Sequence, residues 1–144
     1  MDRPTDQAAH EAARRRVLLA EDDESLRKLI ASSLESDGFE VWQARDGEEL
    51  LAEIETVLAH EPGGADSCVV VTDMHMPGLG GLDVLAVLRC ASVSTPVILM
   101  TAFGDDEVFR EARDLGSISV LSKPFALDTL REAVMAAIRP QPRP

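Results

Sequence analysis

"CVVVTDMHMPGLGG" spans residues 68–81 and places a carboxylate, Asp73, two positions after a run of three valines. A short, continuous apolar run is typical of a strand that is covered on both faces, as in a parallel sheet. The glycines and the proline that follow indicate a turn. Asp73 is therefore predicted at the carboxyl end of a buried strand, where an α/β sheet gathers its functional groups.

Four other segments have the same strand-like character, and helical patterns lie between and after them. The five predicted strands are 17–20, 39–44, 68–73, 96–101 and 118–122. Strict alternation of five strands and five helices predicts an α/β fold with an open, doubly wound parallel sheet. The apolar residues assigned to the inner helix faces are Leu26, Leu29, Ile30 and Leu34; Leu50, Leu51, Ile54 and Leu58; Leu82, Leu85 and Leu88; Val108, Ala112 and Leu115; and Leu127, Leu130, Val134 and Ile138.

The composition limits the function classes. The chain has 144 residues and a formal net charge of −12, with 26 acidic against 14 basic residues. Such a balance repels phosphate backbones and anionic membranes, so nucleic-acid binding by this chain alone is not expected. No apolar stretch suggests a signal peptide or a membrane span. Cys68 and Cys90 are interpreted as reduced core residues of a cytoplasmic protein.

The chain is predicted to hold one folded domain, residues 16–139, between two tails. Residues 1–15 are polar or rich in alanine and are expected to form a flexible N-terminal tail. Residues 140–144 form a Pro-rich C-terminal tail that cannot continue a helix. The segment "HEPGGADS", 60–67, is predicted to be a surface loop.

Polar residues follow four of the predicted strands. Glu21 and Asp22 come after the first strand, Asp73 ends the third, Thr101 ends the fourth and Lys123 follows the fifth. Three carboxylates that converge repel one another unless a cation joins them, and Mg²⁺ is the hard ion that accepts such a set. A carboxylate beside a metal and an ammonium can also act as a nucleophile toward phosphorus. This convergence argues against the alternative that Asp73 only caps a turn.

Four motifs in the same order resemble the response-regulator receiver domain, the phosphoacceptor module of two-component signalling. They are "VLLAEDDESLR" (17–27), "VVVTDMHMPGLGGLDVL" (69–85), "VILMTA" (97–102) and "VLSKPF" (120–125). The resemblance covers about residues 16–139 and implies a flavodoxin-like sheet of order 2-1-3-4-5.

The resemblance also implies roles for the polar strand ends. Asp73 would be the phosphoacceptor, and Asp22 and Asp73 would bind Mg²⁺ directly. Glu21 would act on the ion through water, and the backbone carbonyl of His75 would be a further ligand. The His75 side chain itself is interpreted as exposed.

Three further residues complete the expected site. Thr101 and Lys123 would each contact a phosphoryl oxygen, and Pro124 stands where the family has a cis peptide bond. Receivers commonly carry Tyr or Phe three residues before the lysine as a reporter of phosphorylation, but this chain has Val120 there and no Tyr. We therefore expect the signal to leave through Phe103, the nearest aromatic residue after Thr101.

The expected partners are a histidine kinase or histidine phosphotransfer protein and a downstream protein or output domain. The resemblance implies a signalling phosphoacceptor, with slow autodephosphorylation, and not a conventional enzyme. One alternative is a receiver portion of a longer regulator, such as a transcription factor, whose output domain is missing. A magnesium-dependent phosphohydrolase would be expected to carry a second aspartate where His75 stands. A flavin-binding protein would be expected to have a Ser/Thr/Gly phosphate loop where this chain has "AEDDE", 20–24.

Overall fold

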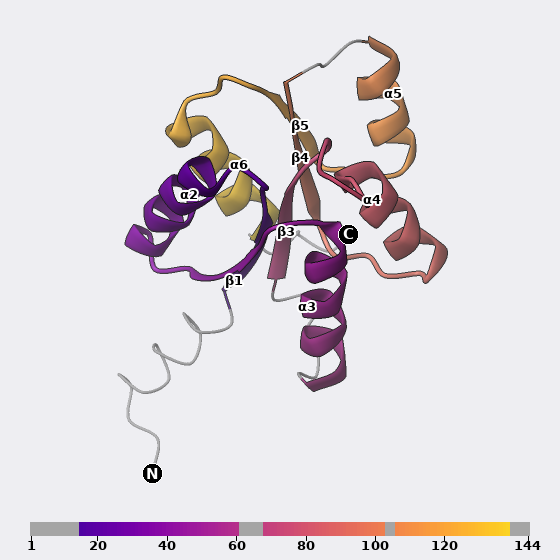
Figure 1. The fold of residues 1–144 in the computed structure, drawn as a ribbon, viewed down its shortest axis with the longest axis horizontal. Coiled ribbons are helices and arrows are strands. Elements are labelled where there is room, and N and C mark those ends of the chain that lie inside the picture. The colour runs from indigo at the N-terminus through magenta and orange to yellow at the C-terminus, as the bar shows by residue number, and fades with distance from the viewer. Residues whose placement is uncertain (1–14, 61–67, 103–105, 139–144) are drawn as a thin grey trace, which may run out of the picture.

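A computed structural model of the chain describes residues 15–60, 68–102 and 106–138. It contains one parallel sheet in the order β2-β1-β3-β4-β5, which confirms the predicted topology (Figure 1). The strands are β1 (Arg16–Ala20), β2 (Glu40–Ala44), β3 (Cys68–Asp73), β4 (Val97–Thr101) and β5 (Ser119–Ser122). The helices are α2 (Glu24–Ser36), α3 (Gly47–His60), α4 (Gly81–Cys90), α5 (Asp106–Asp114) and α6 (Leu127–Ile138).

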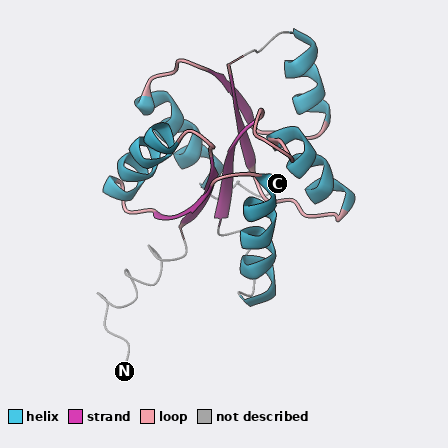
Figure 2. Ribbon diagram, viewed as in Figure 1, coloured by secondary structure: helices cyan, strands magenta, loops and turns pink. Residues whose placement is uncertain are grey.

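Helices cover both faces of the sheet (Figure 2). Helices α2 and α6 lie on one face, and α3, α4 and α5 lie on the other. β3 is the central strand, and every one of its six residues is buried. This double cover explains why its sequence is a continuous apolar run that ends in Asp73.

The core consists of two apolar clusters, one on each side of the sheet. Successive strand residues alternate between them, so that Leu18 belongs to one cluster and Leu19 to the other. Most of the predicted inner helix positions are buried or half-buried. The placement of Leu29 and Leu58 was wrong, because their exposed fractions are 54% and 37%. Leu29 lies about 100° around the helix from Ile30, so it turns toward solvent, and Val57 takes the inner position in place of Leu58.

The two cysteines have different surroundings. Cys68 is buried at the start of β3, as predicted, but Cys90 is exposed, so its assignment to the core was wrong. The inner face of α4 consists of Gly81, Val84, Leu85 and Leu88. Cys90 follows Leu88 by two positions and therefore points away from the sheet.

Local hydrogen bonds set the start of α2 and of α3, and a glycine marks the end of α2. The side chain of Asp23 accepts a hydrogen bond from the amide of Leu26 and caps α2 directly after the acidic pair of the sequence. Asp46 accepts one from the amide of Glu49 at the start of α3. Helix α2 ends before Gly38, whose φ of 92° lies in the left-handed region. The two hydrogen bonds thereby fix where α2 and α3 begin.

Several expectations concern residues outside the described ranges. These include the C-terminal tail, all but residue 15 of the N-terminal tail, residues 61–67 of the predicted loop, and Phe103. Among the described residues, none of the helices combines the length and the apolar character needed to cross a membrane.

One carboxyl group on α3 predicts a pH-dependent change in stability. Burial, together with the nearby Glu49, raises the pKa of Glu53 to about 7. Its Oε1 atom is buried and accepts no hydrogen bond from the described residues. Because the folded state favours the protonated carboxyl group, Glu53 makes its full contribution to the free energy of unfolding below the ordinary pKa of about 4.5. That contribution is lost as the pH rises through about 7.

We therefore expect Glu53→Gln to increase the free energy of unfolding by about 1 kcal/mol at pH 8, after allowance for the partial solvation of the carboxylate. The gain should shrink toward zero at pH 4. Urea denaturation at both pH values measures it. Glu55→Gln, at an exposed position of the same helix, is the control and should change little. An equal effect of Glu53→Gln at pH 4 and pH 8 would contradict this prediction.

Candidate functional site

Three carboxylates meet at the carboxyl edge of the sheet. Glu21 and Asp22 follow β1, and Asp73 ends β3, the neighbouring strand. Each offers an oxygen that lies within 4.8 Å of the others. Glu21 and Asp73 are buried, with exposed fractions of 1% and 5%, whereas Asp22 is exposed. The structure thus brings together the three acidic residues that the sequence predicted as metal ligands.

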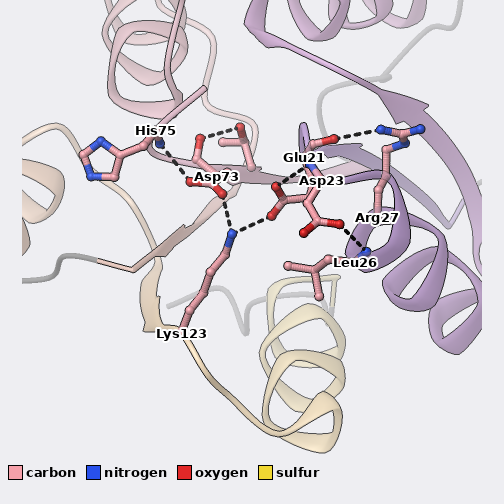
Figure 3. Close-up of polar contacts among 8 residues, drawn as sticks. Glu21, Asp23, Leu26, Arg27, Asp73, His75 and Lys123 are labelled. Carbon is pink, nitrogen blue, oxygen red and sulfur yellow. Dashed lines mark hydrogen bonds and ion pairs between the residues drawn. The ribbon is translucent and has the colours of Figure 1, made fainter. Parts of the chain in front are cut away.

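Lys123 joins two of these carboxylates from the other side of the site. Its Nζ donates a hydrogen bond to Glu21 Oε1 at 2.6 Å and another to Asp73 Oδ2 (Figure 3). The lysine follows β5, and its backbone amide donates to the carbonyl of Thr101 at 2.7 Å. The lysine is therefore anchored to the end of β4 while its side chain reaches the acidic group.

Burial and charge act in opposite directions on the ionisation of this cluster. Burial raises the pKa of Glu21, and the nearby Asp73 adds to the increase, while hydrogen bonds from Lys123 and from the Asp23 amide oppose it. Burial lowers the pKa of Lys123, but its bonds to Asp73 and Glu21 outweigh this, and the net pKa is raised. The lysine is therefore held as a cation inside an anionic site.

The loop after Asp73 is held close to the end of β3. The backbone amide of His75 donates to Asp73 Oδ1 at 2.8 Å, which orients the carboxylate. A Cβ atom on Gly80 would lie 2.2 Å from the carbonyl oxygen of Met74, and one on Gly81 would lie 2.6 Å from that of Asp73. Only glycine permits these approaches, so Gly80 and Gly81 allow the start of α4 to lie against the end of β3.

The remaining predicted residues lie around this centre. Thr101 is fully buried at the end of β4, one residue after Met100, the register partner of Asp73. The bond between Lys123 and Pro124 is cis, in agreement with the resemblance. Val120 is half-buried and packs against the apolar cluster on the α3 side of the sheet.

His75, whose backbone carbonyl is the metal-ligand candidate, stands between two buried methionines. The His75 side chain is exposed, whereas Met74 and Met76 are buried in the core with exposed fractions of 5% and 9%. Phe103, the expected route of the signal, lies outside the described residues.

Sequence reasoning gave no role to Arg27, which the structure places beside the acidic pair. Its side chain is buried, and it donates to the backbone carbonyl of Glu21 (Figure 3). It also donates to the side chain of Gln43. A signal was present, because Arg27 precedes Ile30, Ala31 and Leu34 at the spacing of the buried face of α2. A charged residue on an apolar helix face requires a buried partner.

The donor set suits a hard divalent cation. Three carboxylates with oxygens this close, one of them exposed, offer the ligands that Mg²⁺ prefers and leave room for water. A single ammonium cannot balance three negative charges, so the site retains a net attraction for a cation.

The fold and the site together define an α/β protein of the flavodoxin-like class with an acidic, lysine-bridged centre at the carboxyl edge of its sheet. The chain belongs to the response regulator receiver domain family, whose model matches residues 17–135. The resemblance read from the four sequence motifs is thus confirmed.

Individual relatives agree with this assignment. The chain is 29% identical to sporulation initiation phosphotransferase F of Bacillus subtilis over 83% of its own length and 90% of that protein. It is 33% identical to the transcriptional regulatory protein PdtaR of Mycobacterium tuberculosis over 90% of its own length, but it spans only 60% of that regulator.

Solved structures show the same fold. The receiver domain of Francisella response regulator 1452 matches with a TM-score of 0.77 and 33% identity, over 87% of this chain and 97% of that one. The chemotaxis protein CheY4 of Vibrio cholerae matches with a TM-score of 0.72 and 28% identity, over 85% and 97% of the two chains.

Proposed function

We propose that this protein accepts a phosphoryl group from a phosphohistidine onto Asp73, in a magnesium-dependent reaction, and thereby switches a surface that binds another protein. The observation that carries the proposal is the arrangement at the sheet edge. Lys123 bonds to Asp73 and Glu21, and these two carboxylates and Asp22 have oxygens within 4.8 Å of one another, in a chain of the receiver family.

The transfer needs a nucleophile and a way to balance the charge of the incoming group. A carboxylate oxygen of Asp73 attacks phosphorus, a P–O bond forms and the P–N bond to the donor imidazole breaks. The imidazole keeps the electron pair and takes up a proton. The ammonium of Lys123 moves from the carboxylate to a phosphoryl oxygen, and the hydroxyl of Thr101 donates to another.

The chain's own residues also provide the metal site. Asp22 and Asp73 would hold Mg²⁺ directly, Glu21 through water, and the backbone carbonyl of His75 as a further ligand. When bound, the ion supplies positive charge to the phosphoryl oxygens and so lowers the barrier to attack by an anion.

The partners and the cellular setting form part of the same proposal. A cytoplasmic histidine kinase or histidine phosphotransfer protein supplies the phosphoryl group, and a downstream protein reads the phosphorylated state. Domain 16–139 performs both tasks. The protein acts as a signalling phosphoacceptor and returns slowly to its resting state by hydrolysis at Asp73.

The experiment that tests the proposal is incubation of the purified protein with acetyl phosphate and magnesium, with intact mass as the readout. A mass increase of one phosphoryl group, located at Asp73 by peptide mapping, is the expected result. Labelling at another residue, or equal labelling after removal of magnesium by EDTA, would contradict it.

The metal site predicts a linked change in stability. Because the three carboxylates repel one another, Mg²⁺ that binds only the folded state should stabilise it, by about 2.7 kcal/mol at a hundred times the dissociation constant. Asp22→Ala should slightly raise the stability of the metal-free protein and eliminate the magnesium response. Thermal denaturation with and without magnesium chloride measures both effects.

A matched control separates this site from general charge effects. Asp128→Ala removes one negative charge from an aspartate whose side chain is 82% exposed on α6. This variant should keep the full magnesium response. If Asp22→Ala gains as much melting temperature from magnesium as the wild type does, the ion binds elsewhere.

A further inference from the structure

The backbone of the acidic pair lies where the sheet's hydrogen-bond ladder stops. The amide of Glu21 donates to the carbonyl of Ala44, the last residue of β2, at 3.1 Å. In a parallel sheet, the backbone amide of a residue farther along β2 would donate a hydrogen bond to the Glu21 carbonyl. That bond is not formed because β2 ends at Ala44. The peptide group between Glu21 and Asp22 therefore needs another donor.

Arg27 provides that donor. Its Nη1 donates to the carbonyl oxygen of Glu21 at 3.0 Å in a buried contact, and its Nε donates to Gln43 Oε1 at 3.2 Å. The arginine lies on the first turns of α2, and its exposed fraction is 8%. Its side chain thus connects α2, the end of β1 and the edge strand β2.

The direction of Asp22 depends on this contact. The Glu21 carbonyl belongs to the same planar peptide group as the Asp22 amide, so fixing that oxygen fixes the plane from which the Asp22 chain leaves. Asp22 is exposed, and no packed core restrains its side chain. The backbone orientation is consequently the main restraint on where its carboxylate lies relative to those of Glu21 and Asp73.

We infer that Arg27 is a positioning residue. It orients Asp22 through the Glu21 carbonyl and so sets the affinity of the acidic site for magnesium. This inference rests on the proposed magnesium site. The guanidinium donates its hydrogen bonds to the Glu21 carbonyl and to Gln43, and not to the three carboxylates. It acts from behind the ligands, as hydrogen-bond partners of metal ligands commonly do.

Charge and position make opposite predictions, which makes the inference testable. Removal of a cation next to three carboxylates would by charge alone strengthen Mg²⁺ binding. Loss of the restraint on Asp22 would weaken it. We expect the positional effect to prevail, so that Arg27→Met weakens magnesium affinity about tenfold, the lower end of the range typical of such partners.

The experiment is calorimetric titration of metal-free wild type and variants with magnesium chloride, beside thermal denaturation of each. Arg131→Met is the matched control, because Arg131 forms a two-pronged ion pair with Asp37, the residue that caps the end of α2, and not with the acidic group. It removes the same charge and should leave magnesium affinity unchanged even if its melting temperature falls.

Arg27→Lys keeps the charge but cannot serve both acceptors with the same geometry, and it covers the case in which Arg27→Met does not fold. It should also bind magnesium more weakly than the wild type. Unchanged or tighter binding in a folded Arg27 variant would overturn the inference while the magnesium site of the wild type stands. Absence of magnesium binding by the wild type would overturn the proposed metal site together with the inference.

Discussion

Asp73→Asn is expected to show no covalent labelling by acetyl phosphate under conditions that label the wild type. The substitution keeps the shape of the side chain, and the amide oxygen can still accept the hydrogen bond that the His75 amide gives to Asp73. A neutral amide is, however, a poor nucleophile, and the variant also loses the charge that holds Lys123 and would help to hold the metal. Intact mass after a time course with donor and magnesium is the measurement.

Two controls make this result specific. Asp128→Asn applies the same chemical change to an exposed aspartate on α6 and should leave labelling intact. Circular dichroism of Asp73→Asn should show a folded protein, because the substitution also removes part of the charge repulsion among the three carboxylates. Equal labelling of Asp73→Asn and the wild type would reject Asp73 as the acceptor.

The sequence predicted the parallel sheet and the carboxyl-edge site because two patterns were strong, whereas the strand order was implied by the resemblance to the receiver family. Apolar runs covered on both faces identify the strands of a parallel sheet, and β3 is buried at all six positions. Parallel strands end at one edge, so residues that are far apart in the chain, such as Glu21 and Lys123, could be expected to meet. In the structure Lys123 Nζ lies 2.6 Å from Glu21 Oε1.

The predictions were weaker where a residue's environment depends on its position around a helix. Leu29, Leu58 and Cys90 are apolar and lie next to inner positions, yet a step of one or two residues turns them to solvent. Apolar residue type alone cannot make this distinction, because a folded protein also exposes many apolar atoms.

Arg27 shows the opposite problem, a charged residue that the fold buries. Its acceptors are a backbone carbonyl at the end of β1 and a side chain on β2, and neither is evident before the strand ends are known. The carbonyl of Glu21 becomes an acceptor without a ladder donor only because β2 stops at Ala44. Such a role follows from where a sheet ends, which sequence patterns place only to within a few residues.

The second large effect is expected from Lys123. This side chain bonds to two buried carboxylates, and it is itself mostly buried, with a side-chain exposure of 21%. Lys123→Met fills similar space but leaves Glu21 and Asp73 close together without a counter-charge. Removing one partner of a buried ion pair typically costs about 3–5 kcal/mol. Because the lysine is partly solvated, we expect about 2 kcal/mol at pH 8, measured by urea denaturation in EDTA.

The chain's other lysine is a matched control. Lys28 pairs with Glu24 on the surface of α2, where the two side chains are 65% and 68% exposed. Lys28→Met makes the same chemical change and should cost no more than about 0.5 kcal/mol, since exposed pairs contribute little. Equal losses from the two substitutions would show that the contacts of Lys123 do not stabilise the resting protein.

Magnesium should reverse the effect of Lys123→Met on stability but not its effect on chemistry. A divalent cation held by Glu21, Asp22 and Asp73 replaces the missing positive charge, so the variant should gain more stability from magnesium than the wild type gains. Phosphorylation by acetyl phosphate should remain slow in the same magnesium-loaded variant, because no ammonium is left to receive a phosphoryl oxygen. If magnesium restores neither stability nor labelling, the lysine and the metal do not share one site; if it restores both, Lys123 serves only the stability of the resting state.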